Sequence, residues 1–167
     1  MRAGFTLMEL LLVMAIIAIL GSIIMGSVTY ISRVSRKRRA EVTCRVLETA
    51  LSRYRSDCNK WPYGSLKPKK NASSGKEEVT ATGKGNAEVF GALRERSGEN
   101  ADKIRYLDET TVFTLDKDGQ PIPLSRAGAG EKPLIYISRD TATPKYFKVV
   151  INLDDDTVAV TAEELNQ

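Results

Sequence analysis

The chain has 167 residues and a mass of 18.4 kDa, which is enough for one ordinary domain and a membrane segment but not for two domains. Lysine and arginine number 25 against 21 acidic residues, and this modest excess gives no reason to expect a nucleic-acid partner. The chain has no histidine. Within this chain, that excludes Ser-His-Asp or Cys-His catalysis and mixed Cys/His zinc sites.

An apolar run dominates the first 30 residues, with no charged residue from Leu10 to Tyr30. About 20 apolar residues, at a rise of ~1.5 Å each, span the ~30 Å hydrocarbon core of a bilayer. A cleaved secretory signal would need a basic leader, a shorter apolar core and a small-residue cleavage site, which this run matches poorly. The sequence therefore predicts one membrane helix over residues 5–30.

Glu9 is the one acid inside this run. A lone carboxylate in hydrocarbon is costly, and such residues usually have a function and a partner. The alternative is that Glu9 lies close enough to the membrane surface to be solvated.

The string Gly4-Phe5-Thr6-Leu7-Met8-Glu9-Leu10 follows a very short leader and precedes a long apolar segment. It resembles the N-terminus of type IV pilins and of the pseudopilins of type II secretion. The resemblance implies that residues 1–4 are a leader, that a prepilin peptidase cuts between Gly4 and Phe5, and that the new amine of Phe5 is N-methylated. The apolar run is then kept as membrane anchor and fibre core. In a stack of such subunits, Glu9 would neutralise the Phe5 ammonium of a neighbour, a pair favoured in a low-dielectric core.

No proline occurs before Pro62, so one helix is predicted from about Phe5 to about Asp57. Its second half, within residues 31–60, is amphipathic. Apolar residues recur there at spacings of three and four, which defines one face: Cys44, Leu47, Leu51, Tyr54 and Cys58. We expect this face to pack in a groove of the head.

The two cysteines, Cys44 and Cys58, would be ~21 Å apart on an unbroken helix, far beyond the ~7 Å limit for bridged Cα atoms. We expect no bond between them and interpret both as buried small hydrophobic side chains. A helix that ended before Cys58 would reopen the possibility of a bridge. With two cysteines and no CxxC motif, a zinc or redox site is not expected.

One basic cluster follows the apolar run: Arg33, Arg36, Lys37, Arg38 and Arg39. The positive-inside rule would place it in the cytoplasm, against the orientation that the resemblance implies. We follow the resemblance, because its motif is more specific than a charge count. The cluster then either neutralises anionic headgroups or acids of neighbouring subunits, or forms a solvated collar.

The segment YRSDCNKWP, residues 54–62, is similar to the segment that closes the long helix in major pseudopilins, where a tyrosine, an acid and an aromatic-proline pair recur. We expect Pro62 to stop the helix and Trp61 to bury its ring, so that together they anchor the head. The family usually has a glycine near Asn59, and this chain has none.

Residues 61–167 are predicted to form the head. The lysine-, serine- and glycine-rich residues 67–85 predict a mobile surface loop, and residues 87–96 predict a short helix. Strands are predicted at residues 111–115, 134–137, 146–153 and 157–161, with an acidic turn between the last two. The fold class is therefore α+β and pilin-like: a long N-terminal helix packed on a small antiparallel sheet at the C-terminus.

Acidic turns supply the oxygen ligands that hard cations prefer. Major pseudopilins as a family have a calcium site in their C-terminal loops, but its residues have no match here. Acidic turns are usually only turns, so no cofactor is expected and calcium is kept as the one candidate. Its candidate ligands are Asp154, Asp155 and Asp156, with Asp116, Asp118 or Asp140.

The resemblance implies a structural subunit and not an enzyme. Such a subunit is a single-pass prepilin of the bacterial inner membrane, with its N-terminus cytoplasmic and its head periplasmic, which then enters a homo-oligomeric periplasmic pseudopilus for protein export. The implied partners are the prepilin peptidase, the inner-membrane assembly platform, other pseudopilins and the lipid bilayer. A surface type IV pilus is the close alternative, although the C-terminal region lacks the cysteine pair common in pilins. For the third alternative, a membrane-anchored enzyme or binding domain, the sequence offers no nucleophile elbow or phosphate cradle.

Overall fold

The structure is a computed structural model that describes residues 7–94, 100, 102–110, 112–127, 133–136 and 145–163. Side chains at positions 23–30, 32, 33 and 36 lie outside the described part. The chain divides into two compact units, Met1–Arg39 and Ala40–Gln167.

Helix α1 extends from Leu7 to Cys58, which confirms the long helix predicted from the absence of proline. It ends four residues before Pro62. The next residue, Asn59, has a φ of 53°, the left-handed conformation that commonly ends a helix. Glycine usually occupies this position, and asparagine is the other residue that tolerates it. Asn59 therefore takes the place of the glycine that the sequence lacks.

The amphipathic half of α1 buries the predicted face in the core of the second unit. Leu47, Leu51 and Tyr54 are fully buried and Cys44 is 8% exposed, whereas Cys58 is half-buried. The same core contains the inward side chains of strand β6 (Lys145–Asn152), namely Phe147, Val149 and Ile151. The contact between helix and sheet that the sequence predicted is therefore confirmed.

The described strands form one antiparallel sheet of seven strands, with β6 at its centre. Strand β7 (Thr157–Glu163) pairs along one edge of β6. Strands β2 (Glu77–Ala81) and β5 (Leu134–Tyr136) share the other edge, β2 opposite the end of β6 and β5 opposite its beginning. Beyond β2 lies β1 (Lys69–Lys70), and beyond β5 lie β3 (Phe113–Leu115) and β4 (Pro121–Pro123).

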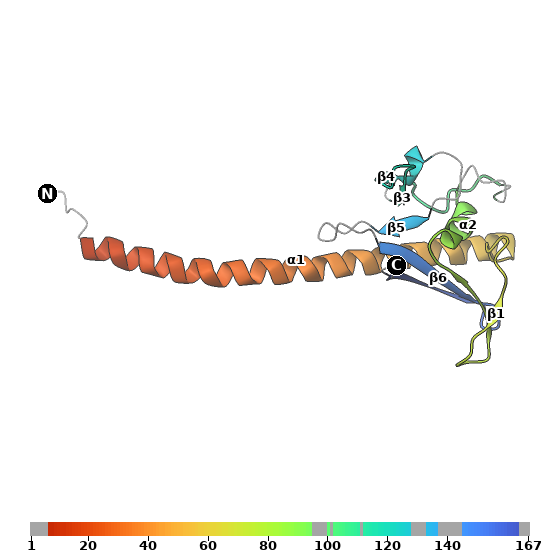
Figure 1. The fold of residues 1–167 in the computed structure, drawn as a ribbon, viewed down its shortest axis with the longest axis horizontal. Coiled ribbons are helices and arrows are strands. Elements are labelled where there is room, and N and C mark those ends of the chain that lie inside the picture. Colours follow the sequence, from red (N-terminus) through yellow and green to blue (C-terminus); the bar gives the residue numbers. More distant parts are fainter. Residues whose placement is uncertain are drawn as a thin grey trace. The chain divides into compact units, whose positions relative to one another are not determined.

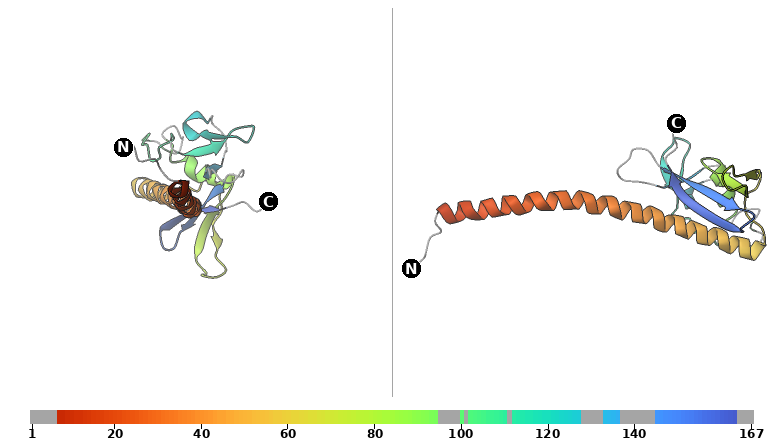
Figure 2. Two further views of the ribbon diagram at one scale, coloured as in Figure 1. Left: turned by 90° about the vertical axis from the view of Figure 1, so that its left-hand side faces the viewer. Right: turned by 90° about the horizontal axis from the view of Figure 1, so that it is seen from below.

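Strands β3, β5, β6 and β7 lie where the alternating sequence predicted strands. The prediction for residues 67–85 was wrong, because strands β1 and β2 form a hairpin there that pairs with β6. Figures 1 and 2 show this hairpin projecting from the rest of the head. Lysine, serine and glycine disfavour a strand locally, but backbone pairing with β6 and the burial of Val79 and Ala81 outweigh that preference. Strand β4, with a proline at each end, was not predicted either; such a strand is suited to the edge of a sheet.

Helix α2 (Gly85–Gly91) begins two residues before the predicted helix and ends at Gly91; Leu93 is buried in the turn that follows. Its Phe90 packs edge-on against Phe147, with ring centroids 6.4 Å apart, so α2 covers the same face of β6 as α1. A short 3-10 helix, η1 (Leu124–Arg126), follows β4. The head is therefore an α+β layer with both helices on one face of the sheet.

Asn86 joins α2 to the sheet from a fully buried position. Its amide nitrogen donates to the carbonyl oxygens of Leu134, at 3.0 Å, and of Phe147, at 2.8 Å. Its side-chain oxygen accepts a hydrogen bond from the backbone N–H of Leu134, at 2.8 Å. One side chain thus satisfies three buried backbone groups where β5 and β6 meet.

We expect Asn86→Ala to lower the free energy of unfolding by at least ~3 kcal/mol, because three buried backbone groups lose their partner. Chemical unfolding of the full chain in detergent, followed by the fluorescence of its single tryptophan, Trp61, measures this loss. The matched control is Asn71→Ala in the β1–β2 hairpin, where water can replace the lost contacts, and its cost should stay below ~1 kcal/mol. Equal costs for the two variants would contradict the role given to Asn86.

Candidate functional site

Of the N-terminal candidates, Glu9 lies within the described residues. Gly4 and Phe5 are outside the described residues. Glu9 lies in the first turn of the helix and its side chain is exposed. An acid at this position interacts favourably with the positive end of the helix dipole, which stabilises the charged carboxylate.

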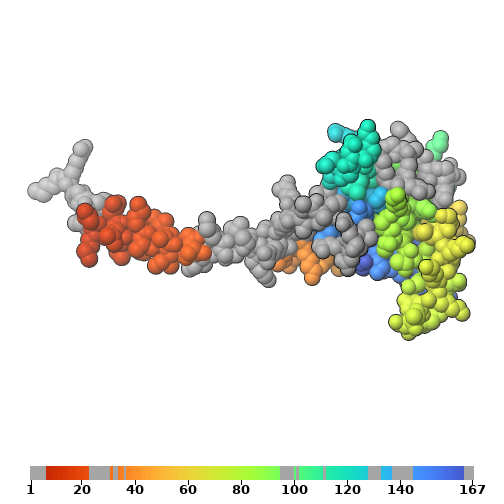
Figure 3. Space-filling model, viewed as in Figure 1, coloured from red at the N-terminus to blue at the C-terminus, as the bar shows by residue number. Residues whose placement is uncertain are grey.

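The first part of α1, drawn in red and orange in Figure 3, exposes large apolar side chains, between 47% and 83% of each. A helix that is apolar all round belongs in a membrane or in the core of a larger assembly. Its Ser22 hydroxyl donates to the carbonyl of Ile19, at 2.7 Å, so this polar group is satisfied without water. The residues concerned are Leu7, Met8, Leu10, Leu11, Leu12, Val13, Met14, Ile16, Ile17, Ile19 and Leu20.

Among the described residues, no helix is both long enough and apolar enough to cross a membrane. The span predicted for residues 5–30 includes positions 5 and 6, which lie outside the described residues, and positions 23–30, whose side chains lie outside the described part.

The predicted head anchor, Trp61 and Pro62, is buried. The indole Nε1 of Trp61 donates to Asp156 Oδ1, at 2.7 Å. Arg55 Nε donates to the same oxygen, at 2.9 Å, and Arg55 Nη1 donates to Asn59 Oδ1, at 2.8 Å. Asp156 therefore joins the end of α1 and the segment after it to the β6–β7 turn.

These contacts also lower the pKa of the Asp156 carboxyl. The hydrogen bonds from Arg55 and Trp61 hold the pKa of its carboxyl below the usual value, because both favour the charged form. The sequence predicted Asp156 in an acidic turn, and nothing in it indicated a pairing with Arg55. They are 101 positions apart, and no local pattern connects them.

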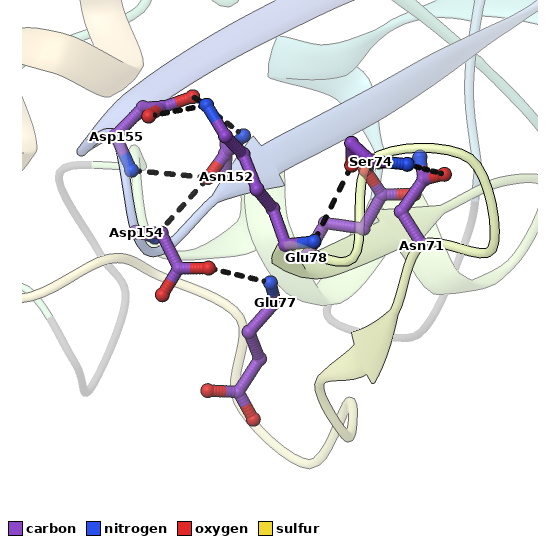
Figure 4. A network of polar contacts seen from close by, with 8 residues as sticks. Asn71, Ser74, Glu77, Glu78, Asn152, Asp154 and Asp155 are labelled. Atoms are coloured by element: carbon purple, nitrogen blue, oxygen red, sulfur yellow. Dashed lines mark hydrogen bonds and ion pairs between the residues drawn. The ribbon is translucent and has the colours of Figure 1, made fainter.

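The other two acids of the turn have different partners (Figure 4). Asp154 Oδ2 accepts a hydrogen bond from the backbone N–H of Glu77, at 2.8 Å. The Asp155 carboxylate forms an ion pair with Lys76, at 2.6 Å, and accepts from the side-chain amide of Asn152. The turn thereby ties the base of the β1–β2 hairpin to β6.

Asp154, Asp155 and Asp156 thus each have a different partner within the protein. Among the described residues, no group of three or more acids or cysteines is placed to hold a metal. Asp116 accepts from the backbone N–H groups of Asp118 and Gln120 in its own turn, and Asp140 lies outside the described residues.

Both cysteines are unbonded and belong to the same helix. Burial above all, together with the nearby acids Glu48 and Glu41, raises the pKa of the Cys44 thiol to about 11. Such a thiol is almost entirely protonated at neutral pH and therefore unreactive.

Glu48 has a structural role that the sequence did not reveal. Its Oε1 accepts a hydrogen bond from the backbone N–H of Val160 in β7, at 2.8 Å. Among the described strands β7 pairs only with β6, so this contact satisfies an N–H on the other edge of β7.

The comparisons with known proteins agree with the N-terminal part of this description. Residues 1–25 match the family described as the prokaryotic N-terminal methylation motif, the leader of type IV pilins and pseudopilins. No curated protein and no solved structure matches the chain. The motif and the α+β fold together support a membrane-anchored, type IV pilin-like prepilin subunit, a structural protein.

We expect Asp156→Asn to lower the thermal midpoint at pH 7 by roughly 2–4 °C. Because the folded-state pKa of Asp156 is depressed, its contribution is complete above the unfolded-state value near pH ~4 and is lost as the pH falls below it. The difference between wild type and variant should therefore shrink as the pH falls below ~4. Asp118→Asn, at an exposed turn, is the control and should leave the midpoint unchanged; a difference that is constant with pH would refute the account.

We also expect calcium to leave the thermal midpoint of the full chain unchanged, because the three acids of the β6–β7 turn already bind protein donors. The measurement compares scans in excess calcium and in excess chelator. A midpoint that rises with calcium and returns with chelator would show a site elsewhere in the chain, and Asp140→Asn would then be tested first.

Proposed function

We propose that this chain is a subunit of a type II secretion pseudopilus, a helical fibre of the periplasm that serves protein export. The observation that carries the proposal is the methylation motif at residues 1–25, from which a helix of 52 residues extends, beginning at Leu7. The segment at residues 54–62 favours a pseudopilus over a surface pilus, because it resembles the end of the long helix in major pseudopilins.

Processing comes first in this function. A prepilin peptidase cuts after Gly4 on the cytoplasmic side of the inner membrane, and the new amine of Phe5 is methylated. Removal of the leader takes Arg2 away and leaves an N-terminal ammonium four residues before Glu9. The sequence after Glu9 then has no charged residue up to Tyr30.

The exposed side chains of residues 7–20 suit two environments in turn. In the membrane, lipid tails cover them; in the fibre, the same helices of neighbouring subunits do so. Lipid tails and leucine side chains are about equally apolar, so the exchange carries little hydrophobic cost. The assembly platform of the inner membrane would guide this transfer, and other pseudopilins would join the same fibre.

Glu9 determines the position at which a subunit can enter the fibre. An unpaired carboxylate in an apolar fibre core is strongly unfavourable, whereas one paired with the Phe5 ammonium of a neighbour is much less so. A subunit would therefore be stable in the fibre only at the axial position where its Glu9 carboxylate contacts the Phe5 ammonium of a neighbour. The charge pair thus fixes the axial offset between neighbouring subunits.

The first test is the N-terminus of the mature protein. We expect that the full chain, produced with a prepilin peptidase, begins at methylated Phe5, and that the chain produced without it keeps residues 1–4. Intact mass and N-terminal sequencing distinguish the two products. Gly4→Val is the control and should remain uncut. A chain cut after the apolar run, or never cut, would refute the proposed function.

The second test concerns Glu9. We expect Glu9→Gln, which keeps the size of the side chain but removes its charge, to lower fibre yield at least about tenfold, equivalent to ~1.4 kcal/mol per subunit added. Fibres are measured by sedimentation and electron microscopy from cells that carry the secretion machinery. Ser22→Ala, a polar-to-apolar change on the same helix, is the control. Normal assembly of Glu9→Gln would favour the alternative of a merely solvated carboxylate, and fibres found only outside the cell would favour a surface pilus.

A further inference from the structure

An open cavity lies in the head, where the end of α1 meets the β6–β7 turn. Its volume of about 520 Å³ is within the range of ~300–1,000 Å³ that is typical of ligand sites. The lining comes from two distant parts of the chain, residues 55–64 and residues 153–156. All of it belongs to the unit Ala40–Gln167, so the apolar N-terminal part of α1 takes no part in this cavity.

Part of the lining is apolar and consists of Trp61, Tyr63 and Leu153. All three also pack in or against the core of the head. The indole N–H of Trp61 donates to Asp156, at 2.7 Å, and the backbone N–H of Tyr63 donates to the carbonyl of Trp61, at 3.1 Å. These contacts hold the segment in place, so an aromatic or branched group of a ligand would meet a fixed apolar surface.

The polar part of the lining has hydrogen-bond donors left over. Arg55 uses two of its five N–H groups, on Asp156 at 2.9 Å and on Asn59 at 2.8 Å. Among the described residues, no partner occurs for its other three N–H groups, for the Lys60 ammonium or for the Tyr63 hydroxyl. A ligand that fits this lining must therefore bring acceptors.

The acids in and near the cavity are already bound by protein donors. Asp156, which is part of the lining, accepts two hydrogen bonds on Oδ1. Glu88 accepts from the N–H and the hydroxyl of Ser65, at 3.0 Å and 2.8 Å. Asp57 is 3.9 Å from Arg53 and is not in the lining. The described lining has two basic side chains against the one acid, so its net charge is positive.

The chain that leaves the cavity is also basic. From Lys60 to Lys76 it has five lysines and no acid, whereas residues 40–167 as a whole have 19 basic and 20 acidic residues. Lys76 pairs with Asp155, and the other four lysines form no ion pair with any described residue. Charge of one sign around a cleft raises the local concentration of ligands of the opposite charge. The cavity therefore favours an anion.

The backbone around the cavity is fixed in conformations that most residues rarely adopt. The angle φ is 53° at Asn59, 49° at Gly64 and 52° at Asp156. Surrounding contacts hold such conformations, which gather at functional sites. At Gly64 the contact comes from Glu88, which binds Ser65 and would lie 3.1 Å from a Cβ at position 64. The cavity therefore needs little rearrangement when a ligand enters.

We propose that this cavity binds the C-terminal residue of another polypeptide when that residue is aromatic or branched. Its carboxylate accepts from Arg55, whose planar guanidinium suits a carboxylate and is already oriented by Asn59 and Asp156. Lys60 adds a second positive charge, and Trp61 contacts the apolar side chain. Asp156 Oδ2, which has no partner among the described residues, accepts the peptide N–H of the same ligand residue. Because the cavity is open, the rest of the polypeptide leads out of it.

The fluorescence of Trp61 tests the proposal, because this residue lines the cavity and is the single tryptophan of the chain. The full chain in detergent is titrated with N-acetyl-phenylalanine and, as the uncharged match, with N-acetyl-phenylalanine amide. We expect a saturable change with a Kd below ~1 mM for the acid, and binding at least about tenfold weaker for the amide. Equal binding of the two compounds, or no saturable change, would overturn the proposal.

Variants test the residues assigned to the carboxylate. Arg55→Lys keeps the charge but loses the planar guanidinium, and we expect it to weaken binding of the acid at least about tenfold. Because Arg55 also binds Asp156, the exposed Lys60→Gln provides a second variant that should stay folded and weaken binding about threefold or more. Lys117→Gln, at an exposed turn between β3 and β4, is the control and should bind as the wild type does. Binding by Lys60→Gln that equals the wild type would contradict the assignment.

A longer compound tests the source of the carboxylate. Acetyl-Ala-Ala-Phe adds two residues of polypeptide to the same C-terminal residue, and we expect it to bind at least as tightly as N-acetyl-phenylalanine. Binding about tenfold weaker would overturn the polypeptide as ligand and leave a site for a small free acid. Binding in these titrations requires neither cleavage at Gly4 nor a fibre, so a negative result leaves the proposed function unaffected.

Discussion

The burial of one face of α1 under strand β6 is the interaction on which the head depends. Leu47, Leu51 and Tyr54 meet Phe147, Val149 and Ile151 in a single core. Because the side chains of a strand alternate between two faces, this contact fixes the register of β6, and β6 in turn pairs with β7, β2 and β5. Polar contacts also join the helix to the sheet. Glu48 accepts from an N–H on the edge of β7, and Asp156 joins the β6–β7 turn to the end of the helix.

The two parts of α1 have opposite relations to the rest of the chain. In the second unit the apolar face of the helix is covered by its own sheet, whereas the apolar side chains of residues 7–20 are exposed. A stable fold must bury apolar surface, and a subunit of an assembly leaves some of it for others to bury. The methylation motif at residues 1–25 and the exposed apolar side chains of residues 7–20 therefore both support the proposal of a subunit that buries this surface against its neighbours.

The features predictable from sequence were those with a local cause. The absence of proline predicted α1, a spacing of three and four residues predicted its buried face, and strict alternation predicted β6. The features that were missed depend on residues far apart in the chain. Strands β1 and β2 form in a segment of loop-like composition because β6 pairs with β2, and neither the buried amide of Asn86 nor the Arg55–Asp156 pair has a sequence signature. At the N-terminal site, Glu9 could be placed in the first turn of α1, while the cleavage position rests on the motif alone, since Gly4 and Phe5 lie outside the described residues.

The contacts of α1 with the last two strands set the order in which the head can fold. Arg55 meets Asp156 across 101 positions, and Glu48 meets Val160 across 112. A chain is made with its N-terminal part first, so Leu47, Leu51 and Tyr54 are exposed before their cover exists, because β6 begins only at Lys145. Contacts so distant in sequence slow folding, and an exposed apolar helix face is prone to wrong association during that delay. The packing of β6 on this helix face therefore also ends the period in which the newly made chain is prone to wrong association.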